Sequence, residues 1–378
     1  MPQAIRKALE GIDRGSTAHA GLLLARYLET AVGDKKEHPR RRLELLTAAQ
    51  RALNHAKPLY TLAYDRRMQW LAQVPSLTAA IYTTMDRMII GLGSESALET
   101  GLTLHHTYGV PVIPGSALKG LAAHYCDQVW GNASEAEEYC KRVQVGVDAL
   151  GKPKHRMGRH YKFLFGSHED AGYIQFFDAW ITPDSIGRDN EGLVDDVMTP
   201  HHGDYYGAKD DSAPTDYDEP TPIRYLAVRG TFQLAVSCEL DGDQAQTCAD
   251  LALDLLTDAL KHWGIGGKTS SGYGRLVKNA KATERLKRQF DEIRRAALPN
   301  AVRVQAVVAG WLPGDLAIKL GKKWNLTLSE LGIDGDTLRG LVLSRGDAND
   351  IRRWKDCGEG NKEKAWKRIF GTRDQGNA

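Results

Sequence analysis

The sequence has few cysteines, and they lie far apart. Five cysteines are spread over 378 residues, and no two of them form a Cys-x-x-Cys pair. An odd, scattered set favours reduced thiols in the cytoplasm over a disulfide framework. The chain also lacks any stretch near the ~18 consecutive apolar residues of a membrane-spanning helix, and residues 1–7 lack the apolar centre of a signal peptide. We therefore expect a cytoplasmic protein without a membrane partner.

An excess of one charge is missing as well. The chain has 50 basic and 48 acidic residues, so the net charge does not indicate a nucleic-acid partner, and any basic surface must be local. One basic run, residues 35–42, lies between two helix-like segments, where a solvated loop is the commoner explanation. The length suggests two to three domains at ~150 residues each, and a hydrophobic content of 42% supports a packed core.

Glycine, in contrast, is concentrated in one segment, residues 264–275. These twelve positions hold five glycines, three small hydroxyl residues, Lys268, Tyr273 and Arg275. Glycine accepts positive φ angles, so the segment can bend sharply and expose its N–H groups. Successive exposed N–H groups form a concave anion site, to which the two cations add charge and the tyrosine adds a stacking surface. The pattern predicts contact with a phosphate backbone, as in RNA recognition.

Two phosphate-loop motifs are excluded for this segment. A G-x-x-x-x-G-K-[ST] loop needs a glycine six residues before Lys268, where the sequence has His262. A G-x-G-x-x-G loop opens a helix, whereas here a helix-like run (243–262) comes before the glycines and a strand-like run (275–277) follows them. A flexible turn between a helix and a strand remains an alternative interpretation.

A second candidate anion site opens the helix expected over residues 116–130. Ser116 is a suitable N-cap, and Lys119 falls in the first turn. A cation there opposes the helix dipole, and a bound phosphate would relieve that cost. A tight turn into an ordinary helix, with Lys119 solvated, explains the sequence equally well.

The order of the expected elements indicates an α+β fold. The segments are strand 77–92, helix 116–130, strand 173–181, strand 225–238, helix 243–262 and strand 275–278. This β-α-β-β-α-β series is the ferredoxin-like pattern, which RNA-recognition domains share and whose sheet face often stacks bases. Residues 183–222 are rich in Asp, Gly, Pro and Tyr, and are too long for a plain connection.

The two ends of the chain extend this core. Residues 1–75 have helical periodicity, and 281–295 form an amphipathic pattern, whereas 301–311 are β-like. The expected divisions are 1–75 (helical), 76–280 (core) and 281–378 (extension). The extension ends in basic segments with tryptophan, 352–355 and 364–368. Stacking plus charge would suit RNA, but a packed helical pair with a solvated rim fits as well.

These motifs together resemble the RAMP superfamily of CRISPR systems, and within it the sixth subunit of type III-B Cmr effectors. The resemblance covers about residues 77–280. The segments that carry it are Leu98–Gly109, Ile113–Gly120, Phe165–Ser167, Phe176–Ala179, Asp195–His202, Tyr205–Tyr206 and Gly264–Arg275. Residues after about 300 have no counterpart in the shared core.

The resemblance implies a non-catalytic RNA-binding subunit without cofactor or metal, acting in antiviral defence. It implies binding to the 3′ part of the guide RNA (crRNA), contact with target RNA and with the backbone and small Cmr subunits, and a thumb inserted between core strands 2 and 3, at 183–222. The residues expected on the guide RNA are Ser116, Lys119, Gly266, Gly267, Lys268, Thr269, Ser270, Tyr273 and Arg275.

Two other functions stay open. Histidine suits general acid–base chemistry near neutral pH, so His105 or His106 would serve a RAMP endoribonuclease that processes guide-RNA precursors. Adjacent residues on an extended strand point to opposite faces, so at most one of them serves a given site. The second alternative is an assembly subunit that contacts only protein.

Three further groups have a chemical and a structural interpretation. Carboxylates and imidazoles in 195–210 suit a divalent metal, but an exposed polar thumb explains them better; they are Asp195, Asp196, His201, His202, Asp204 and Asp210. Cys126, Cys140, His155 and His160 lack the close cysteine pair of most zinc sites. Phe176, Phe177 and Trp180 suit base stacking, although the first two face opposite ways and one of them is expected in the core.

Overall fold

The computed structural model describes most of the chain in two compact units. The described residues are 19–28, 37–94, 96, 98, 100–132, 137–148, 150–189, 191–199, 213, 220, 222–298, 300–345, 353–356 and 360–370. Unit 1 is Met1–Phe290 and unit 2 is Asp291–Ala378. The boundary falls inside a helix, ten residues beyond the expected division at 281. Residues before 75 share one hydrophobic core with the sheet of unit 1, so they do not form a unit of their own.

The main sheet of unit 1 has six strands, and all of its pairings are antiparallel. The strands are β1 (Leu77–Thr84), β2 (Val112–Ile113), β5 (Ile174–Phe176), β6 (Ala179–Ile181), β9 (Thr231–Cys238) and β10 (Leu276–Lys278). Their order is β10-β1-β9-β6-β2, and β5 also pairs with β9. The mixed α+β class predicted from the sequence is confirmed, with β9 at the centre of the sheet.

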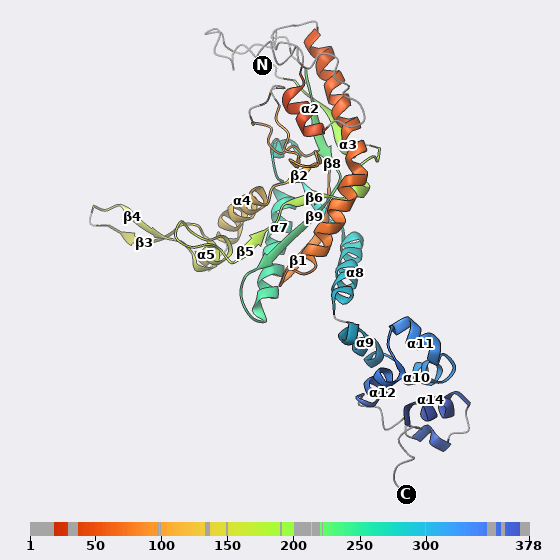
Figure 1. The fold of residues 1–378 in the computed structure, drawn as a ribbon. Coiled ribbons are helices and arrows are strands. Elements are labelled where there is room, and N and C mark those ends of the chain that lie inside the picture. The colour runs from red at the N-terminus through yellow and green to blue at the C-terminus, as the bar shows by residue number, and fades with distance from the viewer. Residues whose placement is uncertain are drawn as a thin grey trace. The chain divides into compact units, whose positions relative to one another are not determined.

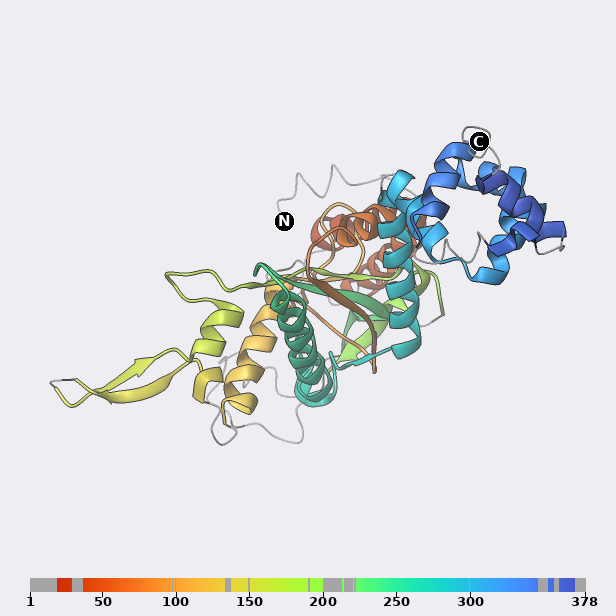
Figure 2. The same ribbon diagram turned by 90° about the horizontal axis from the view of Figure 1, so that it is seen from below.

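Helices cover both faces of this sheet (Figure 1, Figure 2). They are α3 (Glu37–Leu71), α4 (Gly115–Tyr125), α7 (Gln244–His262) and α8 (Ala280–Ala297). On one face, the hydroxyl of Tyr82 is hydrogen-bonded to that of Thr257 on α7. On the other, Tyr60 of α3 donates to the carbonyl oxygen of Ile181, and Ile81 donates to Thr283 at the start of α8. A sheet covered in this way offers bases no open stacking face.

The strand expected over 225–238 is divided at Gly230. This residue has φ +156°, and a Cβ there would lie 3.0 Å from the Cβ of Ser185. Before it, β8 (Ile223–Arg229) leaves the main sheet and pairs with β7 (Gly192–Met198) in a separate two-stranded sheet. The expected excursion therefore contains β7, preceded by a 3-10 turn, η3 (Pro183–Ser185). Most of 199–222 lies outside the described residues.

Two other expected strands are shorter than the sequence pattern indicated. The run over 77–92 ends as a strand at Thr84, and from residue 85 the chain makes only an isolated bridge between Met88 and Val228. The run over 173–181 is interrupted at residues 177–178 and becomes β5 and β6. In both places the apolar pattern of the sequence continues past the point where the strand ends, so the pattern alone did not indicate the end of the strand.

Smaller elements complete unit 1. They are α2 (Ala20–Arg26), η1 (Cys126–Trp130), η2 (Glu137–Tyr139), the hairpin β3 (Val143–Val147) and β4 (Pro153–Arg156), α5 (Arg159–Phe165) and η4 (Thr269–Ser271). The hairpin base is joined to η2 by Glu138, whose carboxylate accepts hydrogen bonds from Arg156 at 2.6 and 3.0 Å. These bonds, with one from the backbone of Arg159, lower the pKa of Glu138 to about 2.

Unit 2 is helical and has its own hydrophobic core. Its elements are α9 (Asn300–Ala309), α10 (Pro313–Ala317), η5 (Ile318–Lys322), α11 (Trp324–Leu331), α12 (Gly335–Leu343), η6 (Arg353–Asp356) and α14 (Gly360–Phe370). The strand expected over 301–311 is wrong, because this segment is helix α9. Its buried residues, Val304, Val308 and Trp311, follow helical spacing. Within the described part of the chain, no helix is both long and apolar enough to span a membrane.

Candidate functional site

The glycine-rich loop, residues 264–275, connects α7 to β10 and bends sharply, as its composition predicts. Gly264, Gly266, Gly272 and Gly274 have φ between 70° and 89°. Lys268 also has a positive φ, 60°, which is uncommon for a residue other than glycine. Five left-handed residues within eleven positions fold the loop back on itself, so that its two ends meet where α7 ends and β10 begins.

Most N–H groups of this loop bond to the protein itself. Those that donate to backbone carbonyls are the N–H groups of Gly264, Ile265, Gly267, Ser271, Gly272, Tyr273 and Gly274. Two of the acceptors, the carbonyls of Arg87 and Ile89, belong to the segment that follows β1. The predicted concave row of exposed N–H groups is therefore wrong for these seven residues, because the loop uses them to hold its own shape.

The glycines also allow close backbone packing. A Cβ at Gly266 would collide with the carbonyl oxygen of Ile89, and a Cβ at Gly274 would collide with that of Ile265. No side chain fits at either place without moving the backbone. These two glycines thus have a structural role that is independent of any ligand.

Lys268 and Tyr273 point into a cluster shared with the β7–β8 hairpin. The Lys268 ammonium lies 5.3 and 5.5 Å from the ring centroids of Tyr225 and Tyr273, within cation–π range. Both phenol groups donate to the carboxylate of Asp196, the first at 3.0 Å. The guanidinium of Arg87 lies 3.6 Å from the same carboxylate. We call these five residues the tyrosine cluster; it joins the loop, both strands of the hairpin and the segment after β1.

Burial keeps the two phenol groups of this cluster neutral. The Asp196 side chain is only 11% exposed. Burial, followed by hydrogen bonding with Tyr273 and Asp196, raises the pKa of Tyr225, and burial with the Asp196 bond raises the pKa of Tyr273. Both phenols therefore remain protonated donors at neutral pH. Lys268 packs over these two neutral rings and is half-buried.

The start of α4 differs from its sequence-based prediction. The helix begins at Gly115 and its N-cap is Pro114, which makes no side-chain capping bond, so Ser116 is not the N-cap. Instead, the Gly115 N–H donates to the Asp178 carboxylate at 2.7 Å. A carboxylate of the protein thus occupies the favourable position at the helix N-terminus. The Ser116 side chain is exposed in the first turn.

The sequence predicts that the start of α4 and the glycine-rich loop form a single cradle. The end of α4 lies beside the end of α7: the Tyr125 hydroxyl is 3.3 Å from Nδ1 of His262, and the Tyr125 and Trp263 ring centroids are 5.0 Å apart. Ser116 precedes Tyr125 by about 14 Å along the helix axis. The contact seen beside the loop is therefore made by the end of α4, and the single cradle of Ser116, Lys119 and the loop stays a prediction.

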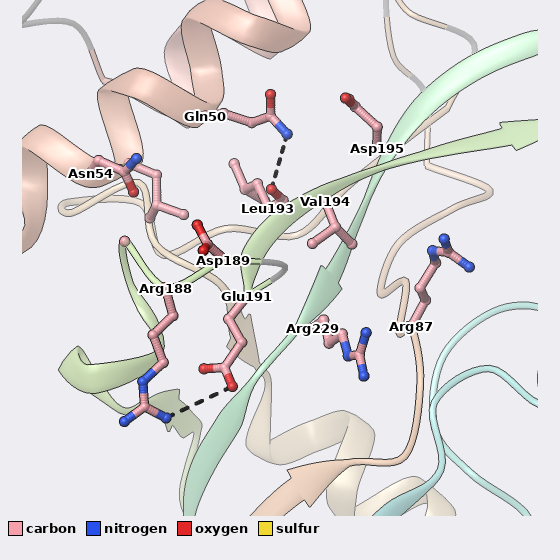
Figure 3. A pocket seen from close by; sticks show the side chains of 12 residues that line it. Gln50, Asn54, Arg87, Arg188, Asp189, Glu191, Leu193, Val194, Asp195 and Arg229 are labelled. Carbon is pink, nitrogen blue, oxygen red and sulfur yellow. Dashed lines mark hydrogen bonds and ion pairs between the residues drawn. The ribbon is translucent and has the colours of Figure 1, made fainter.

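A pocket of about 430 Å³ lies between α3 and the base of the β7–β8 hairpin (Figure 3). Arg87, Arg188 and Arg229 line it, and the Met88–Val228 bridge sets Arg87 and Arg229 beside each other on neighbouring chain segments. The acidic side chains of Asp189, Glu191 and Asp195 line it too, so its charge is mixed. Sequence analysis missed the three arginines, because they are scattered singly and no glycine or basic run marks them.

The two candidate catalytic histidines differ in environment. The His105 ring is 4.8 Å from the Tyr108 ring and 4.9 Å from the Trp180 ring, and its Nδ1 accepts the Thr107 N–H at 3.2 Å. Burial lowers the pKa of His105. His106 is exposed. His105 is thus packed in an aromatic group, with one ring nitrogen engaged locally.

The candidate metal ligands are only partly within the described residues. In the described part of the chain, no group of three or more His, Cys, Asp or Glu side chains is placed to hold a metal ion. Asp195 is exposed on β7, whereas Asp196 belongs to the tyrosine cluster. Cys126 and Cys140 direct their Sγ atoms toward backbone carbonyls. Outside the described residues lie His201, His202, Asp204 and Asp210.

The aromatic residues proposed for base stacking contact other rings of the protein. Phe176 stacks on Phe165 with centroids 6.1 Å apart, and Phe177 packs edge-on against Trp70 of α3 at 5.4 Å. The two rings have different partners, although Phe177 lies just beyond the end of β5. Trp180 lies under the Arg67 guanidinium, 4.9 Å from its ring centroid.

Sequence comparison places the core of this chain in a known family. The model of the RAMP superfamily matches residues 81–277. The CRISPR system Cmr subunit Cmr6 of Pyrococcus furiosus is 33% identical over 255 residues, which are 59% of this chain and 74% of that protein. The CRISPR system CMR subunit Cmr6 of Saccharolobus solfataricus is 24% identical over 196 residues, 50% of this chain and 54%, about half, of its own length.

Two solved structures are also similar. One is the cryo-EM structure of the type III-B Cmr-beta bound to cognate target RNA, with a TM-score of 0.43, 19% identity, and coverage of 66% of this chain and 76% of the other. The second is the crystal structure of Cmr6 from Pyrococcus furiosus, with a TM-score of 0.33, 30% identity, and coverage of 55% and 100%. Since both TM-scores are low, the assignment rests on the sequence matches. The chain belongs to the RAMP superfamily and, within it, to the Cmr6 family.

Proposed function

We propose that this protein is a non-catalytic RNA-binding subunit of a type III-B CRISPR (Cmr) effector, active in antiviral defence. It binds the 3′ part of the guide RNA and its duplex with target RNA, and it contacts the backbone and small subunits. The observation that carries the proposal is the 33% identity to a Cmr subunit over 255 residues, together with a family match that includes the glycine-rich loop.

In this proposal the core is ferredoxin-like and carries a thumb. Its four core strands are β1, the β5–β6 pair, β9 and β10, with α4 and α7 as the two helices. The antiparallel neighbour order β10-β1-β9-β6 supports this assignment. The thumb is the insertion at about 183–222, between the second and third core strands; β7 lies within it and pairs with β8.

The covered sheet directs RNA to loops and edges. On the glycine-rich loop, Ser270 and Arg275 are exposed and would contact phosphate oxygens directly. Lys268 and Tyr273 would contribute indirectly, because their contacts with the β7–β8 hairpin hold the loop in place. Lys119, half-buried on α4, would contact a different nucleotide from the loop. Such contacts position RNA without selecting its sequence.

Salt dependence of binding tests this proposal. The full chain is titrated into labelled single-stranded RNA at several salt concentrations. Loss of one phosphate contact in Arg275→Ala should reduce the log–log salt slope by about 0.7, equally for RNAs of different sequence. Lys278→Ala removes an equal charge from the far end of β10 and serves as the control. An unchanged slope in Arg275→Ala would remove the loop from the site.

The two alternatives have their own tests. To test for the endoribonuclease, the protein is incubated with repeat RNA in the absence of metal. Specific cleavage by the wild-type chain that is lost in His106→Ala or His105→Ala would establish this activity. For a protein-only assembly role, RNA is crosslinked to the complex. Adducts on the peptide that contains residues 264–275 are expected, and their absence would favour the assembly role.

A further inference from the structure

Unit 2 lies beyond the part of the chain that matches the family. The match ends at residue 277, whereas unit 2 begins at Asp291 and has its own core. Its composition differs from that of the rest: residues 291–378 hold 16 basic and 12 acidic residues, against 34 and 36 in residues 1–290. The positive excess of this nearly neutral chain is therefore in unit 2.

Part of this charge is gathered where η5 meets α14. Gly321, at the end of η5, packs so closely on α14 that a Cβ there would collide with the Asn361 carbonyl, and Arg368 donates to the carbonyl oxygens of Leu320, at 3.1 Å, and Gly321. Asn361, Lys364 and Arg368 follow one another on a single face of α14, at helical spacing. The exposed lysines that closely follow the two contacting residues, Gly321 and Asn361, in the chain are Lys322, Lys323 and Lys364, which we call the lysine patch.

The tryptophans of unit 2 are already engaged by the protein. Trp311 is 8% exposed, and the Lys319 ammonium lies 4.9 Å from its ring centroid. Arg368 lies 5.6 Å from the Trp324 centroid, and Trp366 packs on Phe370 at 5.9 Å. Of the two interpretations left open by the sequence, packed helices with a charged rim fit these contacts better than base stacking does.

We propose that the lysine patch is a second RNA-binding surface, which contacts the phosphate backbone without stacking or base recognition. Lysine is depleted in protein–protein interfaces, whereas nucleic-acid interfaces are strongly positive. An ammonium group binds a phosphate as a point charge from any direction. The inference rests on the proposed function for its ligand, but it places the contact in a unit that the family match does not include.

The test compares two variants of the full chain that lose the same charge. Lys322→Ala/Lys364→Ala alters the patch, and Lys287→Ala/Arg288→Ala alters exposed residues of α8 in unit 1. Binding of short labelled single-stranded RNAs of two different sequences is measured by fluorescence anisotropy over a salt series. The patch variant should lower the salt slope by about 1.4, or 0.7 for each lost contact, equally for both RNAs. The control should leave it unchanged, and thermal melting should show that both variants are folded.

The possible outcomes separate this inference from the proposed function. If Arg275→Ala lowers the slope and the patch variant does not, the second surface is overturned and the loop site stands. A lower slope in the patch variant alone supports the patch and removes the loop. If the wild-type chain binds no RNA, both are overturned. If the patch variant keeps its RNA slope but no longer copurifies with other subunits, the patch binds protein and the inference is wrong.

Discussion

The glycine-rich loop and the lysine patch use their basic residues in opposite ways. Lys268 of the loop lies over two tyrosine rings, although the glycine-rich motif around it predicts a phosphate site. Lys322 and Lys323 come from a segment that sequence analysis did not single out, and Lys364 comes from a basic segment with tryptophan, yet all three side chains are exposed. The difference shows that a cation in a glycine-rich sequence is not necessarily available to a ligand, because the same backbone that bends the loop also determines what its side chains contact.

The largest effect is expected from Gly274→Ala, which tests whether the loop is held rigidly. Gly274 has φ 70°, and a Cβ there would collide with the Ile265 carbonyl. Strain and collision together should cost about 2–4 kcal/mol in the free energy of unfolding, measured in urea. Gly272→Ala is the control, since its φ is 87° with open space around the Cβ, and it should cost about 1 kcal/mol. Equal losses would show that collision plays no part.

The next effect concerns the tyrosine cluster. Asp196→Ala leaves two phenols and Arg87 without their shared acceptor, so it should lower the free energy of unfolding by about 1–3 kcal/mol. Its neighbour Asp195 is exposed on the same strand, and Asp195→Ala should stay within about 0.5 kcal/mol of wild type. Denaturant unfolding of both variants measures the difference. A stable Asp196→Ala protein would mean that the cluster does not hold the loop to the hairpin.

A direct comparison of two lysines sharpens the contrast. Lys268→Ala should lower stability by about 1 kcal/mol, through its lost cation–π contacts, with little change in the salt slope of RNA binding. Lys322→Ala should leave stability unchanged and lower the slope by about 0.7. Each variant is measured by both unfolding and RNA titration. If Lys268→Ala lowered the salt slope and Lys322→Ala lowered stability, Lys268 would be the RNA contact and Lys322 the structural residue.

The smallest effect is a pH dependence. Burial raises the pKa of Tyr273 in the folded protein, so the unfolded chain ionises first as the pH rises. The stability that the neutral phenol contributes is complete below the unfolded pKa of about 10 and is lost at higher pH. Between about pH 10 and 11, wild type should lose stability faster than Tyr273→Phe. Parallel decline of the two proteins would contradict the buried, neutral phenol.

Local periodicity predicted some of these features well. Leu255, Leu256 and Leu260 repeat at helical spacing, and all three are buried on α7. The family was also accessible, because its motifs are contiguous in the sequence. What periodicity did not show depends on residues far away in the chain. Ser116 has suitable N-cap chemistry, but the carboxylate of Asp178, just before the strand that pairs with β2, accepts the Gly115 N–H instead.

Whether the lysine of the loop is available to a ligand could not be predicted, for the same reason. Whether Lys268 faces solvent depends on Tyr225 and Asp196, which the chain brings in from the hairpin. The helix at 300–309 was missed for a different reason: its valines favour strands as residue types, and only packing within unit 2 selected the helical spacing of Val304 and Val308.

Gly230 connects the hairpin to the rest of the molecule in a way that has mechanical consequences. β8 continues through this single residue into β9, the central strand, which pairs with β1, β5 and β6. A force applied to the hairpin is therefore transmitted through covalent backbone to the middle of the sheet rather than to its edge. Pulling on the hairpin would load three strand pairings at once, so its base should resist displacement even where its own two-stranded sheet is weak.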